Sequence, residues 1–481
     1  MKINYSRAVR LFAVTAVLIL IGQHLLVPCL AARADAGEGV GAAERIEELL
    51  SEEELSIPGP EVEELEGAYL YNFENDTVLF EYDANEKVYP ASTVKLMTAI
   101  VAFEYFEGRL DTPITVTSAM LDEVSGNKIG FFEGEVVTVE QMLNCMLVNS
   151  ANDAAIILAH ACAGSTDSFV ELMNGKAEEI GAYDTHYTNP TGMHSSAMVT
   201  TARDTAEIAK YAYGISGFME ITATPKYVME ETNLSDYRNI YNRNCMISKY
   251  YSVDYYYSSA IGMNAGATQQ GGYAICAVAE DAEDGLTYLA VVLGADEEDG
   301  VTYNYVNAER MLDWAFSSYG YTKVLTTSQV ICEIDVRLSS ALDYVTLSPE
   351  REISVYLPSS VDPATDIHYS YNTYEDSVDA PVEAGQEVGT ITVIYGDEIL
   401  GSCSLVTTSS IARSEFLYFL DRVGEFTESR FFRATVVSAI VLSILYILAR
   451  AGLRERRFRH PPEIANRYRR RSDTANRYRH Y

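Results

Sequence analysis

The pattern of hydrophobic and polar residues first alternates, then becomes helical, and then alternates again. Alternating apolar runs at 68–71 and 78–80 flank the polar turn Glu74-Asn75-Asp76, which predicts a β-hairpin. Apolar residues at helical spacing then predict helices over 92–106, 139–162, 165–181 and 201–213. Strand-like runs return at 272–279 and 287–294, before a helix at about 303–317. Strands on both sides of a helical middle predict one α/β domain whose sheet is completed by distant segments.

The helical periodicity ends near residue 321, where a second domain is expected. Turn residues such as Gly396-Asp397 separate short alternating strands, at 330–336, 352–357, 367–371, 389–395 and 399–405. We therefore expect an α/β domain over 62–320 and a small all-β domain over 321–412, followed by a helical stalk over 413–433.

The first long apolar run is typical of a secretory signal. Three cations within the first ten residues precede the run Leu11–Gly22, and small residues follow as far as Ala36. We assign 1–36 to a signal peptide, cleaved after Ala34 or Ala36. Cys29 as a lipoprotein acceptor is the alternative, which the preceding Pro28 disfavours.

The second long apolar run, 434–450, predicts a transmembrane helix. Its uncharged part, Ala434–Ala449, covers only about 24 Å as a helix, less than the ~30 Å hydrocarbon core. Neighbouring phenylalanines extend it, and the flanking Arg433 and Arg450 can snorkel outward. A surface-lying amphipathic helix is the alternative, but the run has no polar face. The positive-inside rule then places the basic tail, 451–481, in the cytoplasm and the two domains outside the cell membrane.

Charge is distributed unevenly along the chain. Of the formal net charge of −34, the first 34 residues contribute +4 and the last 32 contribute +8, which leaves −46 for residues 35–449. A body this acidic repels polyanions, and this excludes nucleic acid as a partner of the main domains. Residues 37–61 are acidic and poor in aromatic side chains, which predicts a solvated linker.

The seven cysteines do not indicate a metal site. Cys29 leaves with the signal peptide, and the other six form no Cys-x-x-Cys and no Cys/His ligand spacing. Small buried hydrophobic residues are the favoured interpretation, with a structural disulfide left open. The sequence implies no metal and no organic cofactor.

A candidate nucleophile lies at the start of the first predicted helix. Ser92 and Lys95 are three residues apart, so one helical turn places both side chains on the same face. Serine becomes a nucleophile when a neighbour takes its proton, and a desolvated neutral lysine can do so. The helix N-terminus adds N–H groups for a developing oxyanion. Alone, the pair is more readily interpreted as a serine cap followed by a surface lysine.

A second motif strengthens the first. Ser150 and Asn152 follow an apolar helix, 58 residues after Ser92, and a hydroxyl and an amide two residues apart can point into one cleft. In this order the two motifs match the first two of the three elements of penicillin-binding proteins.

From about residue 62 to 412 the sequence resembles the low-molecular-weight penicillin-binding proteins, the serine-type D-alanyl-D-alanine carboxypeptidases. Further matching segments are Asn189–His194, Thr200–Asp204, Asn242-Arg243-Asn244, Gly272-Tyr273 and Ala380–Gly389. The resemblance implies a penicillin-binding-protein/β-lactamase-like α/β domain, an antiparallel sheet with a helical subdomain. A small all-β domain and the C-terminal transmembrane helix follow it.

The resemblance also implies roles for the motif residues. Ser92 forms the acyl-enzyme, Lys95 is the general base, and Ser150 and Asn152 complete the cleft. Water hydrolyses the ester, so that D-alanine is released from the stem peptide of peptidoglycan. β-Lactams are the other expected ligands.

The third motif departs from the family pattern Lys-Thr-Gly. The aligned residues are Asn264, Ala265 and Gly266, and Thr268 is retained. The family's lysine and threonine supply positive potential and a hydroxyl near the substrate carboxylate. A neutral amide cannot replace an ionic contact of about 1.5–3 kcal/mol. We therefore expect activity on a carboxylate-terminated substrate to be lower by a factor of roughly ten to over a hundred.

Three functions remain open after this comparison. An active carboxypeptidase with weakened or altered carboxylate recognition is favoured, because Ser92 and Lys95 are intact. The alternative is a catalytically impaired, cell-wall-binding or scaffold protein of the same fold, for which Asn264 and Ala265 argue. A β-lactamase is disfavoured: Glu140 and Asn144 match a deacylation pattern but precede Ser150, and we interpret this as coincidence.

Other polar and aromatic residues are discounted as site residues. His160 and His194 come without a Gly-x-Ser-x-Gly elbow, so a helix and a loop position are expected. The tyrosines between 250 and 257 are interpreted as a half-exposed strand or loop rather than a sugar-stacking surface. Whether Lys226 or Lys249 replaces the missing lysine is left open.

Overall fold

The computed structural model describes residues 58–282 and 285–459. The predicted signal peptide, almost all of the acidic linker and the basic tail beyond residue 459 lie outside the described residues.

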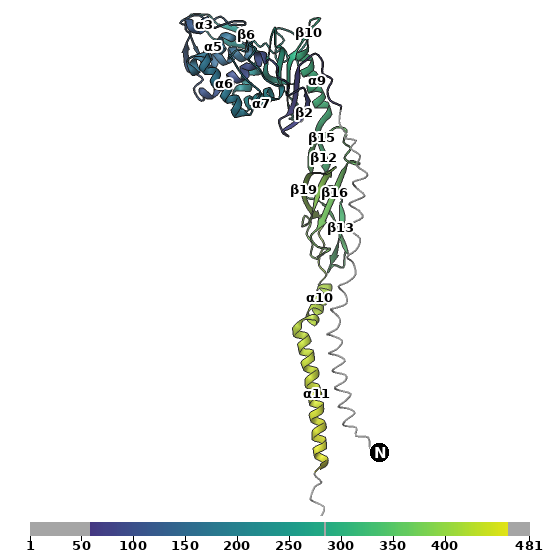
Figure 1. Ribbon diagram of the computed structural model, residues 1–481. Coiled ribbons are helices and arrows are strands. Elements are labelled where there is room, and N and C mark those ends of the chain that lie inside the picture. The colour runs from purple at the N-terminus through teal and green to yellow at the C-terminus, as the bar shows by residue number, and fades with distance from the viewer. Residues whose placement is uncertain (1–57, 283–284, 460–481) are drawn as a thin grey trace, which may run out of the picture. The chain divides into compact units, whose positions relative to one another are not determined.

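A five-stranded antiparallel sheet forms the centre of the first domain (Figure 1). Its order is β2-β1-β9-β8-β7, with the strands β1 Gly67–Asn72, β2 Thr77–Tyr82, β7 Ala260–Thr268, β8 Gly272–Glu280 and β9 Thr287–Ala295. β1 pairs along its whole length with β9, from Gly67 opposite Leu293 to Asn72 opposite Tyr288. The expectation of a sheet completed by distant segments is therefore confirmed, and β7 lies at its edge.

Both faces of this sheet are covered. Leu289, Val291 and Leu293 of β9 pack in one apolar cluster with the helices that follow β2 in the chain. The alternating residues Tyr288, Ala290 and Val292 pack in a second cluster with α9 (Tyr303–Ser318). Figure 1 shows α5, α6 and α7 on the opposite side of the sheet from α9. Because successive strand residues point to opposite faces, burial on both faces explains the uninterrupted apolar sequence of β9.

Apart from α9, the helices of the first domain lie between β2 and β7. They are the 3₁₀ turn η1 Ala91–Thr93, α2 Val94–Tyr105, α3 Ser118–Asp122, α4 Val139–Asn149, α5 Asn152–Ala163, α6 Thr166–Ile180, α7 Ala202–Tyr213 and α8 Phe218–Thr222. Short ribbons pair β3 Pro113–Thr115 with β4 Val136–Thr138, β5 Lys226–Met229 with β6 Arg238–Tyr241, and β10 Glu297–Glu298 with β11 Val301–Thr302.

The helical segment predicted over 139–162 consists of two helices. α4 begins with a capping box between Thr138 and Gln141 and ends at Asn149, and α5 begins at Asn152. Ser150 between them is left-handed, with φ 57° and ψ 37°. The apolar periodicity runs through the break, which hides it from the sequence pattern.

The second domain is all-β, as expected. A six-stranded sheet has the order β16-β18-β19-β14-β13-β17, and β12 pairs with β15. The strands are β12 Tyr319–Leu325, β13 Cys332–Arg337, β14 Tyr344–Pro349, β15 Ile353–Pro358, β16 Ile367–Thr373, β17 Ser377–Asp379, β18 Glu387–Tyr395 and β19 Glu398–Thr407. Gly396, with φ 56°, turns the β18–β19 hairpin at the predicted Gly-Asp pair.

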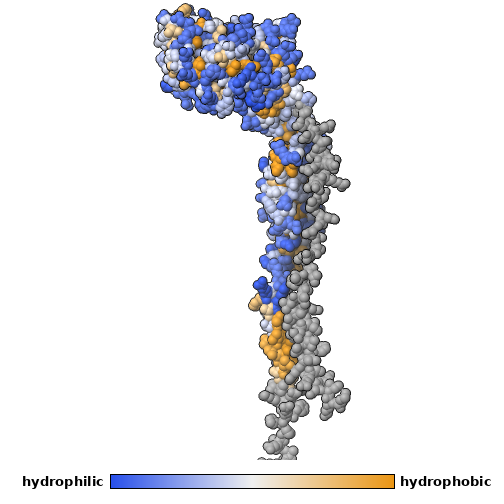
Figure 2. Space-filling view, in the orientation of Figure 1, coloured by the Kyte–Doolittle hydropathy of each residue, from blue (hydrophilic) through white to orange (hydrophobic). Residues whose placement is uncertain are grey.

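Two helices end the described chain, α10 Glu415–Glu428 and α11 Arg430–Arg459. Within α11 the 22 residues Arg430–Ala451 have a mean hydropathy of 2.1 and none is buried. At 1.5 Å per residue they span about 33 Å, enough to cross a hydrocarbon core. Figure 2 shows apolar side chains over the visible face of this helix. The long apolar helix is confirmed, and it extends beyond the predicted 434–450.

The six cysteines that the structure describes are all free. Cys145, Cys162, Cys245 and Cys276 are buried, and burial raises the pKa of each thiol. Interpretation as small hydrophobic residues is confirmed for these four, whereas Cys332 and Cys403 are half-buried.

Candidate active site

Ser92 and Lys95 lie together where η1 leads into α2. Lys95 Nζ is 3.5 Å from Ser92 Oγ, and Lys95 is completely buried. Ala91 has φ 48°, a conformation that costs a non-glycine residue free energy and is concentrated at functional sites. The chain therefore presents the hydroxyl from a strained turn at the start of a helix.

The surroundings of Lys95 favour its neutral form. Its amine donates a hydrogen bond of 2.6 Å to the Thr191 carbonyl oxygen. Burial, together with the positive charge of Arg243, lowers the pKa of Lys95 to about 7. A buried amine near neutrality can accept the proton of an adjacent serine hydroxyl.

The Asn189–Met193 loop holds the two residues in place. Gly192 packs so closely on the nucleophile turn that a Cβ would lie 2.0 Å from the Ala91 carbonyl oxygen, and its φ is +80°. Asn189 Oδ1 accepts hydrogen bonds from the backbone N–H groups of Thr191 and Gly192. The resemblance marked this loop but not its role in binding Lys95. No residue type marks the Thr191 backbone carbonyl as the acceptor for Lys95. The signal in the sequence for a close approach of this loop was Gly192.

Ser150 and Asn152 lie on either side of the break between α4 and α5. Both are nearly buried. Asn152 Nδ2 donates to the Ser125 carbonyl oxygen at 2.7 Å. Asn127, which the sequence analysis missed, donates to the carbonyl oxygens of Asn149 and Ser150 at 2.6 and 3.2 Å. The loop around residues 125–127 thus fixes the left-handed turn that carries Ser150.

The edge strand β7 lies directly against Ser92, the candidate nucleophile. A Cβ on Gly266 would be 2.4 Å from Ser92 Cβ and 2.7 Å from Ser92 Oγ. Only a residue without a side chain allows this approach. The period-two alternation of a strand puts Asn264 and Thr268 on the same face as Gly266.

The other β7 residues differ in their environment. Asn264 is 1% exposed, and neither Oδ1 nor Nδ2 has a hydrogen-bond partner among the described residues. A buried polar group without a partner costs about 1–3 kcal/mol, so this amide is a candidate for ligand contact. Thr268 Oγ1 accepts a hydrogen bond from Gly271 N and so closes the β7–β8 turn. Ala265 packs in the apolar cluster on the α9 side of the sheet.

Backbone strain recurs beside each of the three motifs. Ala91 precedes Ser92, Ser150 is itself left-handed, and Met263, with φ 82°, precedes Asn264. The β7–β8 register shifts between Ala260 and Gly262, a bulge that turns the following side chains. Strain at all three segments is what a site held by its surroundings would require.

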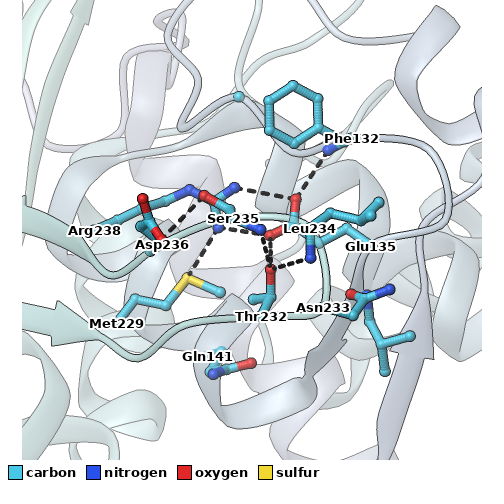
Figure 3. Close-up of polar contacts among 12 residues, drawn as sticks. Phe132, Glu135, Gln141, Met229, Thr232, Asn233, Leu234, Ser235, Asp236 and Arg238 are labelled. Carbon is cyan, nitrogen blue, oxygen red and sulfur yellow. Dashed lines mark hydrogen bonds and ion pairs between the residues drawn. The ribbon is translucent and has the colours of Figure 1, made fainter.

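A buried ion pair fixes the β5–β6 hairpin, as Figure 3 shows. Arg238 Nη1 and Nη2 donate to the two carboxylate oxygens of Glu135 at 2.7 and 3.1 Å. Phe132 N and Thr232 Oγ1 also donate to this carboxylate, whose side chain is fully buried. Burial raises the pKa of Glu135, but these hydrogen bonds outweigh it and leave the pKa below its ordinary value. The pair ties the β5–β6 hairpin to the loop before β4.

One cation, Arg243, acts on the Ser92–Lys95 site, because its charge helps to lower the pKa of Lys95. The sequence analysis named this residue only as part of the matching segment Asn242-Arg243-Asn244. Its guanidinium donates to Asn127 Oδ1 at 3.0 Å. Lys226 instead lies over the Tyr241 ring and Lys249 over the Tyr256 ring. Neither of these two lysines is among the causes of the pKa shift of Lys95.

The residues discounted from the sequence lie outside the motifs. Glu140 is exposed in the first turn of α4. His160 pairs with Glu123 from α5, and His194 lies edge-on to Tyr89 from a loop. The tyrosines at 250, 251 and 256 are 59%, 46% and 42% exposed in a segment without regular strands, so the interpretation as a half-exposed loop is confirmed.

Comparison with known proteins matches two family models to the chain. Residues 62–297 match the model described as D-alanyl-D-alanine carboxypeptidase, and residues 319–413 match the C-terminal domain of penicillin-binding protein 5. D-alanyl-D-alanine carboxypeptidase DacF of Bacillus subtilis is 29% identical over 369 residues, 76% of this chain and 90% of that protein. DacC of Escherichia coli is 26% identical over 75% of this chain and 87% of its own length.

Solved structures share the fold. The D-alanyl-D-alanine carboxypeptidase DacD from Francisella tularensis has a TM-score of 0.53 at 22% identity, over 79% of this chain and all of its own. Penicillin-binding protein 6B from Escherichia coli also has a TM-score of 0.53 at 22% identity, over 74% of this chain and 98% of its own.

Proposed function

Because the chain belongs to the D-alanyl-D-alanine carboxypeptidase family, the low-molecular-weight penicillin-binding proteins, we propose that it removes the terminal D-alanine from peptidoglycan stem peptides through a Ser92 acyl-enzyme. The observation that supports this most directly is the 3.5 Å separation of Ser92 Oγ and the buried Lys95 Nζ.

The proposed acylation uses Lys95 as the base. The neutral amine takes the Ser92 proton as Oγ attacks the carbonyl carbon of the penultimate D-alanine. N–H groups at the start of α2 stabilise the oxyanion that forms. The peptide C–N bond then breaks, and the proton returns through the Ser150 hydroxyl to the leaving amine. Water hydrolyses the Ser92 ester and regenerates the hydroxyl.

The proposed substrate contacts come from Asn152, Asn264, Gly266 and Thr268. Gly266 lets the peptide backbone approach the strand, and Asn152 binds a substrate amide. The buried amide of Asn264 has no hydrogen-bond partner in the part of the chain that the structure describes, which leaves it to hydrogen-bond the substrate. Because the Asn264 amide is uncharged, it contributes less to carboxylate binding than a lysine at the same position would.

We further propose that α11 anchors the protein in the cell membrane, with the two domains outside and the basic tail in the cytoplasm. The length and hydropathy of Arg430–Ala451 support the anchor. The excess of arginine after residue 450 supports the orientation.

D-Alanine release tests the function. The full chain in detergent should release D-alanine from a pentapeptide ending in D-alanyl-D-alanine. The Ser92→Ala variant should not, whereas Ser118→Ala, at the exposed start of α3, should match the wild type. Background release by all three proteins would refute the proposal.

A second candidate function, a catalytically impaired wall-binding protein, is favoured by Asn264 and Ala265 at the third motif. It predicts peptidoglycan binding that survives Ser92→Ala and little labelling by a fluorescent penicillin. Strong labelling that depends on Ser92 would exclude it.

Restoring the family residues discriminates further between these candidates. Asn264→Lys with Ala265→Thr should raise the rate of β-lactam acylation about tenfold or more, because an ionic contact to the carboxylate is regained. Asn264→Lys alone is the matched variant, since Ala265 is buried among α9 residues and threonine adds bulk there. Unchanged rates in both variants would mean that the cleft recognises its ligand by another route.

A further inference from the structure

Arg243 is a cation held at the cleft by contacts on three sides. Its backbone N–H donates to the Val148 carbonyl oxygen at 2.9 Å, just before the turn that carries Ser150. Its guanidinium donates to Asn127 Oδ1 at 3.0 Å and lies 5.1 Å from the centre of the Tyr251 ring. The Tyr251 hydroxyl in turn accepts from Asn149 Nδ2 at 3.2 Å. These contacts restrict a side chain that would otherwise be flexible.

The backbone on both sides of Arg243 is also fixed. Asn242 is 1% exposed, and its Nδ2 donates to the carbonyl oxygens of Thr222 and Thr224 at 2.9 and 3.0 Å. Asn244 is equally buried, and its backbone N–H donates to Asn242 Oδ1. The Glu135–Arg238 pair holds the strand that leads into this segment. Arg243 lies between the two buried asparagines but is itself exposed. Its backbone is therefore fixed, while its charge faces solvent.

Among the described side chains, none forms an ion pair with Arg243. Other arginines of this domain, such as Arg203 and Arg238, form ion pairs with Glu81 and Glu135, but no carboxylate pairs with Arg243 within 58–282 and 285–451. Segments 87–103, 185–203, 238–253 and 259–279 contain no acidic residue, although the chain is strongly acidic. The acid next to the Ser150–Asn152 turn, Asp153, is buried and accepts hydrogen bonds from the backbone N–H groups of Ile129, Gly130 and Ala154. A cleft of this kind attracts an anionic ligand.

Arg243 also acts on the catalytic base from the same cleft. Its charge is one of two causes that lower the pKa of Lys95, after burial. Repulsion between two cations destabilises the empty site, and an anion bound between them relieves it. Asn127 connects the guanidinium to the Ser150 turn through two successive hydrogen bonds.

We propose that Arg243 binds the terminal carboxylate of the acyl donor, in place of the lysine that this chain lacks at Asn264. The inference rests on the proposed function and specifies its substrate recognition. One of the five guanidinium donors is used by Asn127, which leaves donors for a carboxylate. Charge-assisted hydrogen bonds of this kind are about twice as strong as neutral ones.

Paired peptides test the inference. The full chain in detergent is given an acyl-lysyl-D-alanyl-D-alanine peptide with a free C-terminal carboxylate, or the same peptide as its C-terminal amide. Values of kcat/KM are measured at pH 9, about two units above the pKa of Lys95. The ratio between the two peptides reports carboxylate recognition and is independent of the pKa of Lys95.

Arg243→Gln should reduce kcat/KM for the free acid about 10- to 100-fold and leave the amide nearly unchanged. Arg243→Lys should retain part of the preference. Lys249→Gln, which removes a nearby exposed cation, is the matched control and should keep the wild-type ratio. Asn264→Lys added to Arg243→Gln should restore the preference for the acid.

If kcat/KM of Arg243→Gln falls equally for both peptides, or falls for neither, the inference is overturned and the proposed function still stands. If the wild type cleaves neither peptide, the proposed function fails instead. Equilibrium binding of the same two peptides then decides about Arg243: loss of the acid preference in Arg243→Gln supports the inference, and an unchanged preference refutes it.

Discussion

At the scale of single residues, the buried amine of Lys95 has the largest consequence. A buried lysine loses most of the stabilisation that solvent gives its charged form. Here the Thr191 carbonyl oxygen is its closest acceptor, at 2.6 Å, and carries no full charge. The residue is therefore close to equal populations of the protonated and neutral forms at neutral pH.

This predicts the pH dependence of acylation. Below pH 7 Lys95 is protonated and cannot accept the Ser92 proton, so the rate should rise through about pH 7 and level off above it. Acylation by a fluorescent penicillin, followed by stopped flow between pH 5.5 and 9, measures this. Circular dichroism over the same range controls for unfolding. A rate that is constant or falls with rising pH would show that Lys95 is not the base.

Gly266 permits a second prediction. Alanine at this position would force Cβ into Ser92, so the strand or the nucleophile must shift. A misplacement of this size typically costs about 100-fold in rate, and we expect Gly266→Ala to lose that much β-lactam acylation. Ala267→Ser changes the neighbouring exposed residue and should acylate normally. Equal rates for the two variants would contradict the close approach of β7.

The sequence predicted site residues where the chemistry resides in a short motif. Ser92 with Lys95, and Ser150 with Asn152, are each separated by a few positions along the chain. Arg243 and Asn127 meet across 116 residues. Contacts of that kind depend on how distant segments pack, which no local pattern contains.

At the scale of elements, the break between α4 and α5 explains how a polar motif can lie within an apolar helical pattern. Residues on both sides keep the helical spacing because both helices pack into one core. The left-handed Ser150 turns the chain without changing that spacing. The sequence therefore predicted that the segment is helical, but not that the helix breaks at Ser150.

The buried Glu135–Arg238 pair gives a prediction about stability. Arg238→Met leaves a buried carboxylate without its partner, which should lower the free energy of unfolding by about 3–5 kcal/mol. Lys87→Met breaks an ion pair with Asp184 in which both side chains are 56% exposed, and should cost less than about 1 kcal/mol. Urea unfolding of the two variants measures both values. Similar losses would mean that the buried pair is no more important than a surface one.

At the scale of the whole molecule, α11 should determine the compartment in which the chain is found. A chain that ends at Arg413 should appear in the soluble fraction after cell lysis, and the full chain should sediment with membranes. Arginine at both Ile440 and Leu445 should weaken the anchor, because each charge at the bilayer centre costs about 2.5–3.5 kcal/mol. Immunoblots of fractionated cells measure this. A truncated chain that still sediments would indicate a second membrane contact.

The two-domain order was predictable because each part has its own periodicity. Alternation in β18 and β19 and helical spacing in α7 arise from burial of one face, and the sequence records this directly. The length of α11 was underestimated because charged residues such as Arg430 and Arg433 lie within the helix and interrupt the apolar run.

The pairing of β1 with β9 sets an order of events during biosynthesis. Gly67–Asn72 finds its neighbour only at Tyr288–Leu293, more than 200 residues later. An emerging chain cannot close its central sheet before that partner has been made, and loops this long slow the search for the native pairing. Until then the apolar first strand must be shielded from aggregation. Chains cut short before residue 287 should therefore be bound by holdase chaperones or degraded, however complete their nucleophile motif is.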